Sequence, residues 1–210
     1  MTSAHMDIEA AAVAAIIKAG RFAAGQGWVP ATSGNFSVRI DGERIAVTKS
    51  GRDKGSLSPG DITAISAKDP LPPGISAEAP LHAALYARQP GIGAIFHVHS
   101  PNAALISRLH AGRAAVRFQG WELQKAFAGV ASHETALEVP IFANDQDTKA
   151  LAKRIDEALS EPAAVARAPG YLLAGHGLYA WGAAPADAER HLEAFDALFA
   201  LELEMMRISR

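Results

Sequence analysis

The sequence predicts an α/β fold in which helices cover a mixed sheet, and three observations support it. Two short segments of alternating polarity flank Asp41-Gly42, as adjacent antiparallel strands do. Further along, short apolar segments alternate with helical patterns, as in strands joined by helical crossovers. The 210 residues are 49% hydrophobic and 20% charged, a globular balance with ample length for one buried core. We therefore expect one domain over residues 1–210.

The first part of the chain combines a helix, the hairpin and a proline-rich loop. Apolar residues recur at helical spacing over residues 8–24. Residues 36–40 and 44–48 form the two strands of the predicted hairpin. Residues 68–76 are rich in proline, which lacks a backbone donor and fixes φ, so we expect an extended loop there.

The rest of the chain alternates helices and strands. Pro90-Gly91 ends one helical segment, and Pro101 suits the first turn of the next. Gly175-His176-Gly177 separates two short apolar segments that we interpret as strands. The expected helices span residues 79–89, 101–109, 148–159 and 185–206, and the expected strands span residues 94–99, 139–142, 171–174 and 178–181.

Composition and charge exclude several classes of function. A net charge of -2 gives no electrostatic footprint for nucleic acid or an anionic membrane. The apolar stretches are too short to span a bilayer, and the N-terminal pattern is not that of a secretory signal. There is no cysteine, which excludes disulfides, a thiol nucleophile and a cysteine zinc site. We expect a cytoplasmic protein with neither nucleic acid nor membrane as a partner.

Three histidines suggest a metal site. His97 and His99 lie two residues apart at the end of a predicted strand, so both imidazoles project to one face while Val98 points into the core. A His-x-His pair alone can also be two ordinary polar residues that close a strand. His176, between two glycines at another strand end, supplies a third imidazole. Three histidines with an open fourth position are typical of a catalytic zinc-type site. We expect structural roles for His82 and His191.

Two glutamates are candidates for proton transfer. Glu78 follows the proline-rich loop, and Glu122 follows Trp121, whose ring we expect to desolvate the carboxylate and raise its pKa. The alternative for each is a carboxylate at a helix start, where the helix dipole favours negative charge. Local sequence by itself favours that alternative.

Two glycine-containing turns flank the hairpin and predict an anion site. One turn is Thr32–Asn35 and the other is Thr48–Arg52, followed by Lys54. Backbone amides in such turns form concave anion sites, although the same residues also occur in turns for their tolerance of unusual φ and ψ. Neither turn has the spacing of a nucleotide-binding P-loop. The expected phosphate contacts are Ser33, Gly34, Asn35, Ser50, Gly51 and Arg52.

Taken together, these segments resemble the class II aldolase/adducin family over essentially the whole chain. The His97-Val98-His99 and Gly175-His176-Gly177 segments are similar to the broad family. Three other segments resemble the dehydratases within it, namely Glu122-Leu123-Gln124-Lys125, Asn144-Asp145-Gln146-Asp147 and Gly177-Leu178-Tyr179-Ala180-Trp181-Gly182. One departure is Gly74-Ile75-Ser76, where those dehydratases have Lys-Pro-Ser, so a contact on the phosphate side is expected to differ.

The resemblance implies a three-layer α/β/α fold with a mixed, largely antiparallel central sheet. It also implies one Zn²⁺ per subunit on the three histidines, a homotetramer with active sites at subunit contacts, and Ser76 among the substrate contacts. The expected reaction removes water from a methylthio-substituted pentulose 1-phosphate in methionine salvage, with Glu122 as the principal acid/base and Glu78 lining the site.

Two rival functions remain open. A sugar-phosphate aldolase or a pentulose-phosphate 4-epimerase would share the metal and phosphate sites, and in the aldolases the catalytic glutamate matches Glu78. A non-catalytic, adducin-like interaction domain is the other alternative. A scaffold has no need of three histidines and two glutamates, so their presence counts against it.

Overall fold

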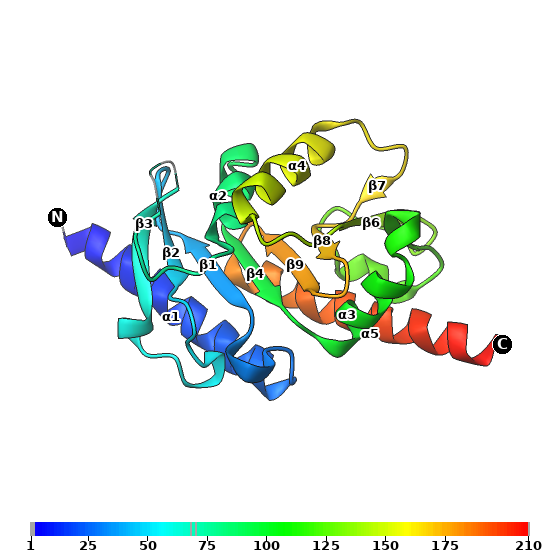
Figure 1. The fold of residues 1–210 in the computed structure, drawn as a ribbon, viewed down its shortest axis with the longest axis horizontal. Coiled ribbons are helices and arrows are strands. Elements are labelled where there is room, and N and C mark those ends of the chain that lie inside the picture. The colour runs from blue at the N-terminus through cyan, green and yellow to red at the C-terminus, as the bar shows by residue number, and fades with distance from the viewer. Residues whose placement is uncertain (1–2, 68, 70, 210) are drawn as a thin grey trace.

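The fold is a nine-stranded mixed sheet between two layers of helices (Figure 1). The computed structural model describes residues 3–67, 69 and 71–209, with side chains from residue 7 onward. Within these residues the strand order is β3-β2-β1-β4-β9-β8-β6-β5, and β7 pairs with β6. Only the β6–β7 and β6–β8 pairs are parallel, so the predicted mixed and largely antiparallel sheet is confirmed. The strands are β1 (Asn35–Arg39), β2 (Arg44–Thr48), β3 (Ile62–Ser66), β4 (Ala94–Val98), β5 (Ala115–Phe118), β6 (Leu137–Phe142), β7 (Ala166–Arg167), β8 (Gly170–Leu173) and β9 (Gly177–Gly182).

Five α-helices of the described chain cover the sheet, with α1, α3 and α5 on one face and α2 and α4 on the other (Figure 1). Successive residues of a strand alternate between these faces. Phe96 therefore packs in the cluster with α1, α3 and α5, while Ile95 packs with α2 and α4. None of the described helices is long and apolar enough to cross a membrane. The helices are α1 (Ser3–Gly25), α2 (Ala79–Arg88), α3 (Pro101–Leu109), α4 (Thr148–Ser160) and α5 (Pro185–Ile208).

Local chemistry explains where several elements turn or begin. Asp41 closes the β1–β2 hairpin, because its carboxylate accepts hydrogen bonds from the backbone N–H groups of Glu43 and Arg44 at 2.9 and 2.8 Å. Asp147 caps α4 in the same way. Ser100 caps α3, and its hydroxyl accepts a hydrogen bond from the backbone of Ala103 at 3.1 Å. This cap turns the chain from strand to helix immediately after the His97-Val98-His99 segment.

Every helix and strand predicted from the sequence is present, with ends displaced by a few residues. The strands β3, β5 and β7 were not predicted, and β7 has only two residues. They form by pairing with β2 and β6, which is a tertiary effect. Residues 68 and 70 of the predicted proline-rich loop lie outside the described residues.

Candidate metal centre

Four side chains from distant parts of the chain converge at one end of the central strands. His97 is on β4, His99 follows it, His176 lies in the turn between β8 and β9, and Glu78 immediately precedes α2. One ligand atom from each of these residues lies within 4.8 Å of the others. The structure therefore brings together the three predicted histidines and one of the two predicted glutamates.

The donor atoms point toward each other. His99 Nε2 lies 3.0 Å from His97 Nε2 and 2.9 Å from His176 Nε2. The Glu78 carboxylate oxygens lie 3.4 Å from His97 Nε2 and 3.3 Å from His176 Nε2. Three imidazole nitrogens with one carboxylate are a donor set that suits a divalent cation.

Hydrogen bonds on the far side of two rings fix which nitrogen faces the centre. His97 Nδ1 donates to the Leu178 carbonyl at 2.9 Å, because a carbonyl can only accept. His176 Nδ1 lies 3.3 Å from the Asn144 amide oxygen. These contacts leave the Nε2 lone pairs facing the centre, as outer contacts of metal-binding histidines generally do. The residues present therefore fit a metal ion.

Burial favours the neutral form of His97 and His99. Burial lowers the pKa of His97 well below its ordinary value, and neighbouring His99 and His176 lower it further. Burial, followed by the charge of His176, lowers the pKa of His99 to about 4. Burial raises the pKa of Glu78, while His176 and the Asn35 side chain, which donates to the carboxylate at 2.5 Å, act in the opposite direction. Unprotonated imidazoles are the form that binds a metal.

Stacked rings and a glycine hold His97 in place. The Tyr179 ring stacks on His97 with centroids 4.0 Å apart, and Tyr171 stacks on Tyr179 with centroids 4.7 Å apart. A Cβ at Gly177 would lie 2.2 Å from the Val98 carbonyl oxygen, so β9 approaches β4 as closely as it does only because residue 177 is glycine.

A cavity of about 300 Å³ adjoins the four converging side chains. Glu78, His99 and His176 line it, together with Asn144 and Lys54. A larger cleft of about 640 Å³ lies at the other end of β4 and β9 and contains none of these residues. The predicted substrate contacts that line the smaller cavity are Ser33, Gly34, Asn35, Ser50, Gly51 and Ser76.

Arg52 and Glu122, also predicted as site residues, lie outside this cavity. The Arg52 side chain is 54% exposed, and its Nε lies 3.3 Å from the Asp61 carboxylate. The Glu122 side chain is 71% exposed and accepts a hydrogen bond from Lys125 Nζ at 2.6 Å. That ammonium lowers the pKa of Glu122, so the predicted rise was wrong. The reason is that Trp121 does not cover the carboxylate and instead donates its indole N–H to Glu202 at 2.8 Å.

Sequence reasoning did not single out Asn144, and it named Lys54 only as a basic residue of the second turn. Asn144 orients His176, and Lys54 is a buried cation. Asn144 belongs to one of the segments that resembled the family, but a segment match by itself gives no contact. The two histidines predicted to be structural stand apart from the centre. His82 Nδ1 pairs with the Ser37 hydroxyl at 2.7 Å, and His191 Nδ1 donates to the Trp181 carbonyl at 2.7 Å.

Comparison with known proteins identifies the family and supports the fold. Residues 14–203 match the family model described as Class II Aldolase and Adducin N-terminal domain. The chain belongs to the class II aldolase and adducin family. Within it, the chain is 56% identical over 198 residues to a protein of Bradyrhizobium sp. named methylthioribulose-1-phosphate dehydratase, covering 93% of this chain and 92% of that one.

Two further members of the family show the range of similarity. A Pseudomonas aeruginosa protein, also named methylthioribulose-1-phosphate dehydratase, is 52% identical, with 93% of this chain and 95% of that one covered. Among solved structures, the L-fuculose-1-phosphate aldolase from Thermus thermophilus is 29% identical with a TM-score of 0.77. That match covers 96% of this chain and 98% of the aldolase. The predicted family and three-layer fold are confirmed.

Proposed function

We propose that this protein is a hydro-lyase that converts 5-methylthioribulose 1-phosphate to 2,3-diketo-5-methylthiopentyl 1-phosphate in methionine salvage. The observation that carries the proposal is the convergence of His97, His99, His176 and Glu78 beside a cavity lined by the two glycine-containing turns. The names of relatives about half identical to this chain support the choice of substrate.

The metal in this proposal is one Zn²⁺ per subunit, held by His97, His99 and His176. Three imidazoles without sulfur ligands suit zinc, and the protein has no cysteine to offer. When bound, a divalent ion supplies Lewis-acid polarisation of a carbonyl group. Removal of the ion with a chelator should abolish turnover and leave the fold in place, because apolar side chains form the core cluster on each face of the sheet without the metal centre.

The chain's own groups must move one proton and release one hydroxide. The C3 hydrogen of the substrate is acidic because it is next to the C2 ketone, and loss of this proton with the C4 hydroxyl gives water and an enol. The enol then becomes the diketone. A carboxylate at the cavity can accept the C3 proton and return it to the departing hydroxyl. The two turns at Ser33–Asn35 and Ser50–Gly51 would bind the phosphate and orient the reacting carbons.

We propose that both glutamates take part in catalysis, each at the cavity of a different subunit. Glu78 acts at the cavity of its own chain, whereas Glu122 lies outside that cavity and acts at the cavity of a neighbouring subunit. This assignment requires an oligomer, which we propose to be a homotetramer. Apolar side chains that subunit contacts would bury support it, namely the exposed Leu105 and Leu109 on α3 and Ile208 on α5. The proposal also treats residues 1–210 as one domain. It places the protein in the cytoplasm because its relatives are named as a metabolic enzyme.

Glutamine substitutions test which glutamate transfers the proton. Glutamine keeps the shape of glutamate but cannot exchange a proton, so only the acid–base step is removed. We expect Glu122→Gln to lose about two to four orders of magnitude in kcat with metal content and KM unchanged. Glu78→Gln should lose less. A dead Glu78→Gln beside a near-normal Glu122→Gln would instead favour the aldolase or epimerase function, which the position of Glu78 in the centre fits.

Mixed tetramers test the neighbouring-subunit role of Glu122. Co-expression of Glu122→Gln with His99→Ala should recover activity, because some cavities then combine an intact His99 with an intact Glu122. Co-expression of His97→Ala with His99→Ala is the matched control and should recover none, since both residues belong to the same cavity. Absence of recovery in the first pair would show that Glu122 does not act across a subunit contact.

A further inference from the structure

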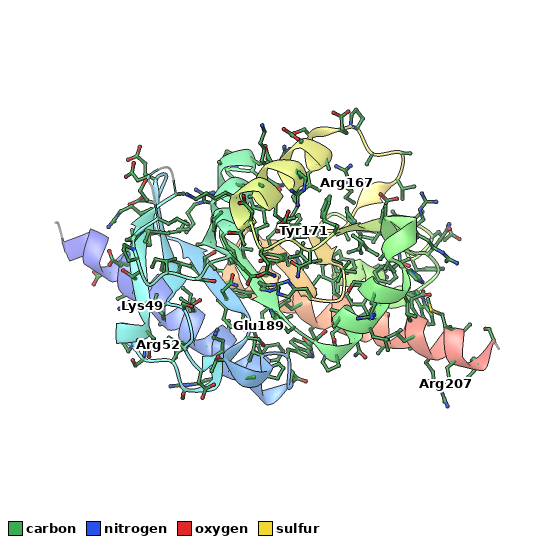
Figure 2. All side chains as sticks on the ribbon, viewed as in Figure 1. Lys49, Arg52, Arg167, Tyr171, Glu189 and Arg207 are labelled. Atoms are coloured by element: carbon green, nitrogen blue, oxygen red, sulfur yellow. The ribbon has the colours of Figure 1, made fainter. Side chains whose placement is uncertain are left out.

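Three cations follow one another closely in the second glycine turn, and their side chains take different directions. The Lys49 ammonium donates to the Gly60 carbonyl at 2.7 Å, at the protein surface. Arg52 is paired with Asp61. Figure 2 shows Lys49 and Arg52 toward the edge of the molecule, away from Tyr171 at its centre. Lys49 and Lys54 both line the cavity beside the metal centre, but the Lys49 ammonium is held by Gly60 in an exposed contact, whereas Lys54 is only 1% exposed.

The Lys54 ammonium joins the two glycine turns. Its Nζ donates to the carbonyl of Thr32 and to the carbonyl of Arg52, both at 2.6 Å. Thr32 and the preceding Ala31 have positive φ values of 63° and 52°, which non-glycine residues adopt at a cost. The hydrogen bond from Lys54 holds this unfavourable backbone in place, so both turns form one cradle.

The backbone that carries Lys54 is fixed by packing against α1. A Cβ on Gly20 of α1 would lie 2.4 Å from the Lys54 carbonyl oxygen, so the two segments touch at a position where only glycine fits. Gly55 also lies close to α1, since a Cβ there would be 3.0 Å from the Ala24 methyl group. The position of the ammonium is therefore set before any ligand binds.

The charge of Lys54 has no anionic partner within the described part of the chain. The carboxylate of Asp53 accepts from the Gly55 backbone at 2.9 Å and from the Ser56 hydroxyl at 2.8 Å. Glu78 is the other nearby acid, and it faces Asn35 and the histidines. An ammonium has three donors, and the two carbonyls use two of them. A buried charge without an ion pair is costly unless a ligand supplies the opposite charge.

We propose that Lys54, rather than Arg52, is the cation that binds the phosphate group of the substrate, and that its bonds to Thr32 and Arg52 shape the phosphate cradle. This inference rests on the proposed function for the identity of the substrate, but its test uses inorganic phosphate and needs no turnover. Lys54 is a binding and positioning residue here, so its loss should affect KM far more than kcat.

Two substitutions at Lys54 separate binding from folding. Lys54→Met keeps the length of the side chain and removes the charge. Lys54→Gln keeps an amide with two donors for the two carbonyls and lacks both the charge and the third donor. If Lys54→Met does not fold, Lys54→Gln carries the test.

The readout is the dissociation constant of inorganic phosphate, measured by calorimetry on the metal-loaded protein. We expect both variants to bind phosphate at least about tenfold more weakly, as loss of a charge-assisted contact generally produces. Metal content should stay the same. Lys153→Met on α4 removes an exposed charge that does not line the cavity, so it should bind phosphate as the wild type does.

Three results would overturn the proposal. One is unchanged phosphate affinity in Lys54→Gln. Another is a larger loss in Arg52→Met than in Lys54→Gln, which would return the role to Arg52. The third is an equal rise in KM for methylthioribulose 1-phosphate and for its dephosphorylated form in Lys54→Gln, which would show a general disturbance of the cavity. Failure of the protein to dehydrate methylthioribulose 1-phosphate would refute the proposed function while leaving the phosphate measurement intact.

Discussion

Replacing Gly177 with alanine tests whether the close approach of β9 to β4 places the metal-binding histidines. The added Cβ would lie 2.2 Å from the Val98 carbonyl oxygen and 3.0 Å from His97 Cε1. Non-bonded heavy atoms prefer roughly 3.5 Å, so β9 must move by about 1 Å. Overpacking of this kind costs about 1–3 kcal/mol, which corresponds to a fall in Tm of about 2–12 °C for a chain of this size.

Gly175→Ala is the matched control on the other side of His176. Gly175 has a φ of +67°, and a Cβ there meets nothing within 4 Å. The cost is therefore backbone strain of about 1–2 kcal/mol, without displacement of His97. The two variants should lose similar stability in a chelator. They should differ in metal affinity, where a shifted ligand typically costs about 10–100-fold.

The assay is competition of each variant with a chromophoric chelator, alongside thermal unfolding in excess chelator. We expect Gly177→Ala to lose at least about tenfold in metal affinity and Gly175→Ala to lose much less. Wild-type metal affinity in Gly177→Ala, or the greater loss in Gly175→Ala, would refute the idea that strand spacing positions the centre.

Three other predictions follow from the same structure. His97→Ala and His99→Ala should each strip the metal from purified protein, and full occupancy in the double mutant would contradict the assignment. Ser50→Ala should mainly raise KM, so collapsed turnover with unchanged substrate binding would argue against a phosphate contact. Burial lowers the pKa of His82 from 6.5 to about 3, so the folded state binds fewer protons than the unfolded state below pH 6.5. The free energy of unfolding therefore falls as pH falls below 6.5, and His82 accounts for about 2 kcal/mol of the loss at pH 5. Chemical unfolding of His82→Gln, measured in chelator, should show a pH-dependent loss of stability that is smaller by this amount.

Local patterns in the sequence predicted most of the fold. The Asp41-Gly42 turn, the proline at the start of α3 and the helical spacing of α1 act within a few residues, so they can be interpreted without tertiary information. The His97/His99 pair could be predicted for the same reason, because residues two apart in a strand share a face. His176 was proposed as the third imidazole from its position between two glycines at another strand end, whereas the pairing of β4 with β9, which brings it beside the other two, forms only in the fold.

Side-chain direction in the turns could not be predicted. Arg52 and Lys54 lie two residues apart and are both basic, yet Arg52 pairs with Asp61 at the surface while the Lys54 ammonium is buried against the carbonyls of Thr32 and Arg52. Glu122 shows the same limit, because whether Trp121 covers it depends on Glu202 of α5, which binds the indole. In each case a contact from a remote element decides what the residue can do.

The most direct test of the central claim is product analysis after incubation of metal-loaded protein with 5-methylthioribulose 1-phosphate. The account predicts a single phosphorylated product that retains all carbons, has lost one water and carries the adjacent ketones of the diketone, as followed by NMR and mass spectrometry. Cleavage between C3 and C4 into dihydroxyacetone phosphate and a methylthio-aldehyde would contradict it and identify the site as an aldolase.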